Sequence, residues 1–269
     1  MKRITTFSTF ALLTMLSFAS CKKDNDTIPP ASDELVPLSI EFDNIVGGQN
    51  LQLNTGSYKN AAGEFFSVNI LQYFISNISL KKADGTVYTI PQDSSYFLIR
   101  ESDPATRFAK VKVPEGEYTS LTFVLGVDSL RHTMDLSQRK GVLDPAGGME
   151  DGMYWGWTMG YIFFKLEGTS PSAPVDPAGI RKFRYHIGGY GSPSFNNIKT
   201  ITIDLNAGGI AKARKGREAN IHLMVDISKF FTGTETISIE QWPMVMLHEY
   251  SIKMADNYAS MFRHDHTEN

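Results

Sequence analysis

The chain has 269 residues, 42% of them hydrophobic, and a formal net charge of −3 at pH 7. This mildly acidic balance argues against nucleic-acid binding, which needs a basic surface, and it indicates no other particular partner. The chain holds a single cysteine, which cannot form a disulfide within the chain and therefore calls for another explanation.

That cysteine, Cys21, ends an N-terminal segment with the pattern of a bacterial lipoprotein signal peptide. Lys2 and Arg3 give a charged start, residues 10–18 are mostly apolar, and small residues precede the thiol. The apolar stretch is shorter than the roughly 20 residues that a membrane-spanning helix needs. We expect residues 1–20 to be removed and Cys21 to become the lipidated first residue of an exported protein. A secretory signal followed by an incidental cysteine is the alternative.

The predicted lipid anchor places the mature protein in the bacterial cell envelope. It would lie on the periplasmic face of the outer membrane or at the cell surface. Residues 21–36 carry charge, proline and serine with few apolar side chains, so they are predicted to form a flexible linker. The folded domain is expected over residues 37–269, where no second linker interrupts the sequence.

Alternating apolar and polar residues predict strands through most of this domain. Residues 38–42 and 66–70 alternate cleanly, and Asp84-Gly85 predicts a hairpin turn. Short strands at near-regular spacing favour an all-β fold, an antiparallel β-sandwich, with a barrel as the alternative. Further strands are expected at 96–100, 108–113, 117–125, 153–166, 182–188, 198–205, 219–227 and 236–239.

A short C-terminal helix is predicted over residues 252–262. Ile252, Ala255, Ala259 and Phe262 recur at helical spacing and would share one face. The residues that follow, with His264 and His266, are expected to form a mobile tail without a defined metal-binding geometry. His132 is expected in a solvent-exposed loop.

The strand expected over residues 153–166 concentrates aromatic and thioether side chains. Period-2 alternation would place Met153, Trp155, Trp157 and Met159 on one face. Gly156 and Gly160 would leave the opposite face open to a close approach. A tightly packed aromatic core and a ligand-binding face are both compatible with this pattern.

Three histidines also share strand faces with polar or thioether side chains. His222 falls on one face with Asn220 and Met224, His248 follows Met244 and Met246 at period 2, and His186 lies opposite apolar neighbours. Imidazole and thioether together suit copper(I), whereas hard ions prefer oxygen ligands. The alternative is that methionine fills the core and each histidine has a structural partner.

Motifs of common enzyme classes are not found in the sequence. It has no nucleophile elbow, phosphate-binding loop, zinc-protease helix or paired-cysteine metal motif. We therefore expect a protein that is not an enzyme. A hydrolase acting on envelope glycans is the enzymatic alternative, since it needs only a pair of carboxylates across a cleft.

The sequence resembles the MbnP family of periplasmic copper-binding proteins over about residues 37–266. The most specific part is a tryptophan-rich block at 152–168, with Phe183-Arg-Tyr-His-Ile-Gly188 after it. Ile221-His-Leu-Met-Val-Asp226 and the closing Asn257, Met261, Phe262 and His266 continue the similarity.

The resemblance implies an exported all-β domain that binds copper and acts in copper acquisition, storage or transfer. In some members a partner di-haem enzyme oxidises a tryptophan to kynurenine, whose aromatic amine joins histidine ligands on copper(I). Here Trp155 or Trp157 would be the modified residue, and His186, His222 and then His248 the imidazole ligands. The alternative is an envelope lipoprotein that uses the same β-domain for a structural role or for binding without metal.

Overall fold

Two β-sheets make up the computed structural model, which describes residues 34–146, 152–156, 159–191 and 195–269. The prediction of an all-β, sandwich-like fold is confirmed. The predicted signal peptide, Cys21 and most of the predicted linker lie outside the described residues. Among those residues, no helix is long and apolar enough to cross a membrane.

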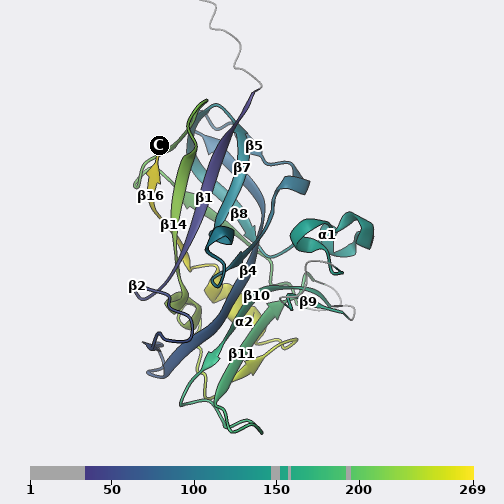
Figure 1. The fold of residues 1–269 in the computed structure, drawn as a ribbon, viewed down its shortest axis with the longest axis vertical. Coiled ribbons are helices and arrows are strands. Elements are labelled where there is room, and N and C mark those ends of the chain that lie inside the picture. The colour runs from purple at the N-terminus through teal and green to yellow at the C-terminus, as the bar shows by residue number, and fades with distance from the viewer. Residues whose placement is uncertain (1–33, 147–151, 157–158, 192–194) are drawn as a thin grey trace, which may run out of the picture. The chain divides into compact units, whose positions relative to one another are not determined.

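The smaller sheet has five strands, with the first strand of the domain near its centre. Strand β1 (Leu35–Val46) pairs in parallel with β14 (Ala219–Asp226), and β14 pairs antiparallel with β16 (Phe262–Glu268). Strands β2 (Gln49–Asn50) and β7 (Phe108–Pro114) also pair with β1. Figure 1 shows β16, β14 and β1 side by side.

The larger sheet is organised around β4 (Phe65–Lys82). Its main path continues through β8 (Gly116–Leu125) to β12 (Lys199–Asp204) on one side. On the other side it continues through β10 (Gly160–Thr169), β11 (Lys182–Gly188) and β15 (Met244–Val245). Short strands also pair with its inner strands: β3 (Tyr58–Lys59), β5 (Val87–Thr89) and β6 (Tyr96–Arg100) with β4, β9 (Tyr154–Trp155) with β10, and β13 (Ala211–Ala213) with β8.

Buried aromatic side chains join the two sheets. Phe42 of β1 is fully buried and makes edge-to-face contacts with Tyr73 of β4, Phe123 of β8 and Phe262 of β16. Aromatic pairs in this geometry stabilise a core beyond the area they bury. The predicted Asp84-Gly85 turn is also present, because Gly85 takes a positive φ of 88° between β4 and β5.

The helical segments are short. Two α-helices are described, α1 (Ser129–Thr133) and α2 (Ser251–Tyr258). Single turns of 3-10 helix lie between strands as η1 (Gln92–Ser94), η2 (Pro104–Arg107), η3 (Leu136–Gln138), η4 (Gly141–Leu143) and η5 (Ile227–Phe231). Helix α2 confirms the predicted C-terminal helix, although it ends at Tyr258.

The prediction of a mobile C-terminal tail is wrong. Phe262 begins β16, which pairs with β14 as far as Glu268. This strand forms because the edge of β14 would otherwise leave its backbone N–H and C=O groups without partners. The strand predicted at 236–239 is also wrong, because Thr236 makes only an isolated bridge with Thr232 and residues 237–239 form no strand.

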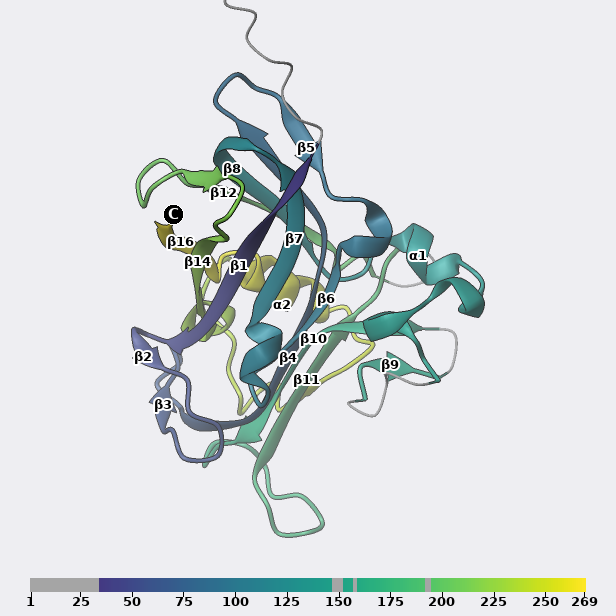
Figure 2. The ribbon, with the colours of Figure 1, turned by 45° about the horizontal axis from the view of Figure 1, so that its top comes forward.

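The predicted strand over residues 153–166 is two strands. Trp155 of β9 pairs with Gly160 of β10, so the chain reverses direction between them. Gly160 has a φ of 72°, a left-handed conformation that glycine adopts without strain. The premise that Trp155 and Trp157 share the face of one continuous strand is therefore wrong, and Trp157 lies outside the described residues. Figure 2 shows β9 beside β10, and β10 beside β11.

Candidate functional site

His186 projects from the face of β11 that points away from the core, as predicted. It lies opposite Lys165 of β10, and its Nε2 atom is 2.7 Å from Oε1 of Glu167. Lys165 and Arg184 also approach this carboxylate, at 3.7 Å and 3.9 Å. The hydrogen bond with His186 is the main reason that the pKa of Glu167 lies below its usual value. The carboxylate is therefore ionised at neutral pH and can accept a hydrogen bond from the N–H at Nε2.

This contact determines which nitrogen of His186 can bind a metal ion. An ionised carboxylate only accepts hydrogen bonds, so Nε2 carries the hydrogen and Nδ1 keeps its lone pair. Metal-binding histidines commonly donate their second ring N–H to a carboxylate, which orients the ring and raises its basicity. The role of Glu167 could not be predicted from the sequence, because its position beside His186 depends on the register of the β10–β11 hairpin.

Trp155 covers the same face of β11, two positions beyond His186. Alternate residues of a strand share a face, so His186 and Gly188 point to the same side. A Cβ atom at Gly188 would lie 2.5 Å from the backbone oxygen of Tyr161 and 2.6 Å from Cζ3 of Trp155, so the indole lies against the glycine. Only glycine permits this approach. Trp155 therefore lies against β11 two positions along the strand from His186.

A thioether lies on the adjoining strand. Strand β15 pairs in parallel with β11, and Met244 lies beside Arg184. Paired residues on neighbouring strands project to the same face, so Met244 shares the face of His186. The methionine is 55% exposed and is accessible from solvent. We define Trp155, His186, Met244 and the supporting Glu167 as the β11 face.

His222 lies in the other sheet, on β14. The predicted alternation is confirmed there, because Ile221 and Leu223 are buried and His222 projects outward. The partners of His222 are Asp43 of β1 together with Asp265 and His266 of β16. The described contacts of His222 and His186 therefore belong to separate groups of side chains.

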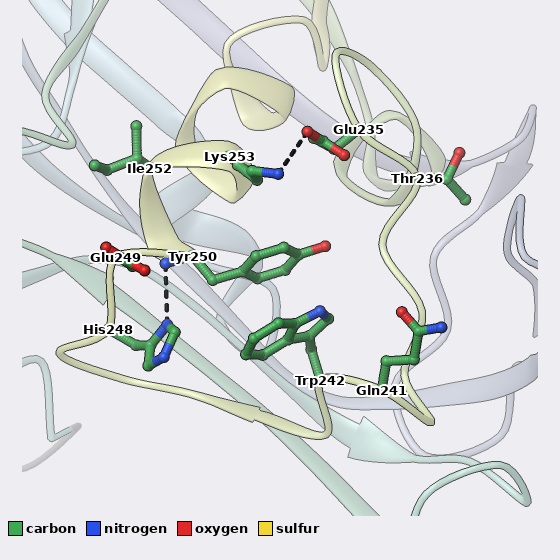
Figure 3. Close-up of a pocket in the computed structure, with 9 residues that line it drawn as sticks. All are labelled: Glu235, Thr236, Gln241, Trp242, His248, Glu249, Tyr250, Ile252 and Lys253. Atoms are coloured by element: carbon green, nitrogen blue, oxygen red, sulfur yellow. Dashed lines mark hydrogen bonds and ion pairs between the residues drawn. The ribbon is translucent and has the colours of Figure 1, made fainter.

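His248 lies in the segment that leads to α2 and lines a pocket of about 620 Å³ (Figure 3). Its Nδ1 atom accepts a hydrogen bond from the backbone N–H of Tyr250 at 3.0 Å. Its ring lies against Trp242, which stacks on Tyr250 with ring centroids 4.1 Å apart. The tryptophan beside His248 is thus Trp242, which the sequence analysis did not consider as its partner. Aromatic side chains therefore line the pocket, and one ring nitrogen of His248 is already hydrogen-bonded to the backbone.

The prediction that His132 is exposed is wrong. Its segment forms α1, begun by the side chain of Asp128, and the histidine is only 5% exposed. The imidazole stacks on Tyr190 and meets Tyr161 edge-on, with ring centroids 4.3 Å and 4.9 Å away. Among the described residues neither ring nitrogen has a hydrogen-bond partner. Burial, assisted by the positive charge of Arg139, lowers the pKa of His132 to about 3.

Comparison with known proteins identifies the class of domain to which this geometry belongs. The family model named MbnP matches residues 36–248, so the chain belongs to the MbnP family. This confirms the resemblance noted in the sequence.

A solved structure shares the fold. MbnP from Methylosinus trichosporium aligns with a TM-score of 0.51 at 15% sequence identity. The alignment covers 76% of this chain and 80% of that protein. The search of curated proteins gave no match.

Proposed function

We propose that this chain is an envelope-anchored lipoprotein that binds copper at the β11 face and acts in copper acquisition, storage or transfer. Lipidation at Cys21 would hold it on the outer membrane. The observation that carries the proposal is the position of Trp155 over Gly188, next to His186 on one strand face. Membership of the MbnP family supports the same function.

The donors of the β11 face fit copper(I) better than a hard ion. His186 offers Nδ1, since Nε2 faces Glu167, and Met244 offers a thioether on the neighbouring strand. Soft and borderline donors of this kind favour copper(I) over ions that need carboxylates and water. Trp155 in its unmodified form contributes no lone pair, because the indole nitrogen is only a donor.

A tryptophan-oxidising partner would supply the nitrogen ligand that unmodified Trp155 cannot provide. Conversion of Trp155 to kynurenine would cleave the indole ring, with O₂ or peroxide used by the partner as oxidant and the C2 carbon released as formate, and would leave an aromatic amine on the β11 face. The partner, proposed to be a di-haem enzyme, would act on the exported chain before copper binds. We propose no reaction catalysed by this chain itself.

Anaerobic copper(I) titration against a competing chelator tests the proposal. The mature chain carries Cys21→Ser, so that the thiol does not bind copper, and its intact mass reports tryptophan oxidation. We expect one copper(I) per chain and a loss of affinity of about tenfold or more in His186→Ala. The matched control is His248→Ala, which leaves the β11 face intact.

Two results would overturn the proposal. One is the absence of copper(I) binding by this Cys21→Ser chain when it is produced by export in the native bacterium, where the oxidising partner is present. The other is equal affinity in the wild type and His186→Ala. Either would favour the alternative of an envelope lipoprotein that binds another partner through this domain or has a structural role.

A further inference from the structure

The outer face of the five-stranded sheet holds a second group of donor atoms, independent of the β11 face. His222 of β14 lies directly opposite His266 of β16 in the antiparallel register. Directly paired residues have Cβ atoms about 4.5–5.5 Å apart and project to the same side. The two imidazoles are therefore brought together by backbone pairing rather than by chance contact on a loop.

A β-bulge adds a carboxylate to this pair. The register passes from His222↔His266 to Leu223↔His264, so Asp265 is an extra residue without a partner on β14. A bulge breaks the strict alternation of a strand and redirects its side chains. Asp265 consequently projects beside His266, with Oδ2 at 2.9 Å from Nδ1 of that histidine.

The three donor atoms form a triangle of the right size for a metal ion. Nδ1 of His222 is 3.3 Å from Nδ1 of His266 and 3.6 Å from Oδ2 of Asp265. The third distance, from Nδ1 of His266 to Oδ2 of Asp265, is 2.9 Å, so the three distances lie on either side of the ligand-to-ligand spacing around zinc. Ligand atoms bound at about 2.0–2.1 Å in a tetrahedron lie about 3.3 Å from one another.

Both imidazoles also have a carboxylate at their other nitrogen. Nε2 of His222 is 3.7 Å from Oδ2 of Asp43, and Nε2 of His266 is 3.7 Å from Oε1 of Glu268. Carboxylates orient metal-binding imidazoles when they accept a hydrogen bond from the second ring nitrogen, and at 3.7 Å these two make an ionic contact rather than a hydrogen bond. Nδ1 of His266 also faces Oδ2 of Asp265 at 2.9 Å, so binding of an ion between them would displace the hydrogen that the two atoms share.

The remaining surroundings leave the site accessible. The side chains of His222, Asp265 and His266 are 14%, 34% and 48% exposed. Arg263 pairs with Oδ1 of Asp265 at 3.2 Å, which leaves Oδ2 directed at the histidines. A fourth coordination position therefore faces solvent and can be filled by water.

We propose that His222, His266 and Asp265 bind a divalent transition-metal ion, Zn²⁺ or Cu²⁺. Two imidazoles and a carboxylate are borderline and hard donors, which suit these ions better than copper(I). The site would join β16 to β14 through the ion. It does not depend on oxidation of a tryptophan or on the β11 face.

The test uses Zn²⁺ as the probe, in competition with a chromophoric chelator, on the mature chain with Cys21→Ser. We expect one tight site, weakened about tenfold or more in His222→Ala, in His266→Ala and in Asp265→Asn. His264→Ala is the matched control, since His264 lies on the same strand but bonds to Thr267. Circular dichroism shows whether each variant is folded, and Asp265→Asn keeps the size of the side chain.

A second readout is the melting temperature, which zinc should raise in the wild type and not in His222→Ala. His186→Ala should bind zinc like the wild type, which separates this site from the proposed copper site. The proposal is overturned if the wild type binds neither Zn²⁺ nor, in the same competition, Cu²⁺. It is also overturned if the three site variants bind zinc as tightly as His264→Ala does.

Discussion

The buried imidazole of His132 makes a quantitative prediction about acid stability. Burial lowers the pKa of His132 to about 3 in the folded protein, whereas an unfolded histidine titrates near 6.5. The unfolded state therefore binds the extra proton first as the pH falls. The stabilising contribution of the neutral ring is complete above about pH 6.5 and is lost progressively as the pH falls toward 3.

The size of the effect follows from the two pKa values. Each unit of pH within this window changes the free energy of unfolding by about 1.4 kcal/mol for one proton. Between pH 7 and pH 5, protonation of His132 lowers the free energy of unfolding by about 2 kcal/mol. This is less than two full units of pH would give, because the unfolded histidine takes up little proton until the pH falls below about 6.5. The variant His132→Phe keeps an aromatic ring against Tyr190 and removes the titrating group.

Urea unfolding at both pH values measures this difference. The free energy of unfolding of the wild type should fall by about 2 kcal/mol more than that of His132→Phe. Tyr190→Phe serves as the control, since it keeps the ring that stacks on the imidazole and should retain the wild-type pH dependence. Equal pH dependence in the wild type and His132→Phe would refute the reasoning.

Three further predictions follow from the described contacts. Gly188→Ala should displace Trp155, because the new Cβ would overlap both the indole and the backbone oxygen of Tyr161, and it should shift the tryptophan fluorescence; an unchanged spectrum would contradict this. Glu167→Gln should weaken copper(I) binding by roughly tenfold or more by removing the carboxylate that orients His186, as a chelator competition would show; unchanged affinity would count against that role. Phe42→Ala should lower the free energy of unfolding, measured in urea, by about 3–5 kcal/mol; a decrease below about 1 kcal/mol would show that the core repacks to fill the cavity.

Local patterns in the sequence predicted the parts of the fold that depend on single strands. The period-2 alternation placed Ile221 inward and His222 outward, as the structure has them. Helical spacing located α2, although not its end. These features depend on which face of one element is buried, and that information is local.

The pairing between strands could not be predicted from the sequence. The apposition of His222 and His266, and the bulge at Asp265, depend on a register between segments far apart in the chain. Residues 153–166 were predicted as one continuous strand, because the alternation of residue types continues through the segment between Trp155 and Gly160 where the chain reverses. His132 was misplaced for a similar reason, since a polar residue in a loop gives no sign of the aromatic rings that cover it.

The most direct test of the proposed function is anomalous X-ray diffraction at the copper edge from crystals of the copper(I)-loaded mature chain carrying Cys21→Ser. The account predicts an anomalous peak within bonding distance of Nδ1 of His186, beside residue 155. Copper held only by other side chains, or no ordered copper in crystals grown with an excess of the ion, would contradict it.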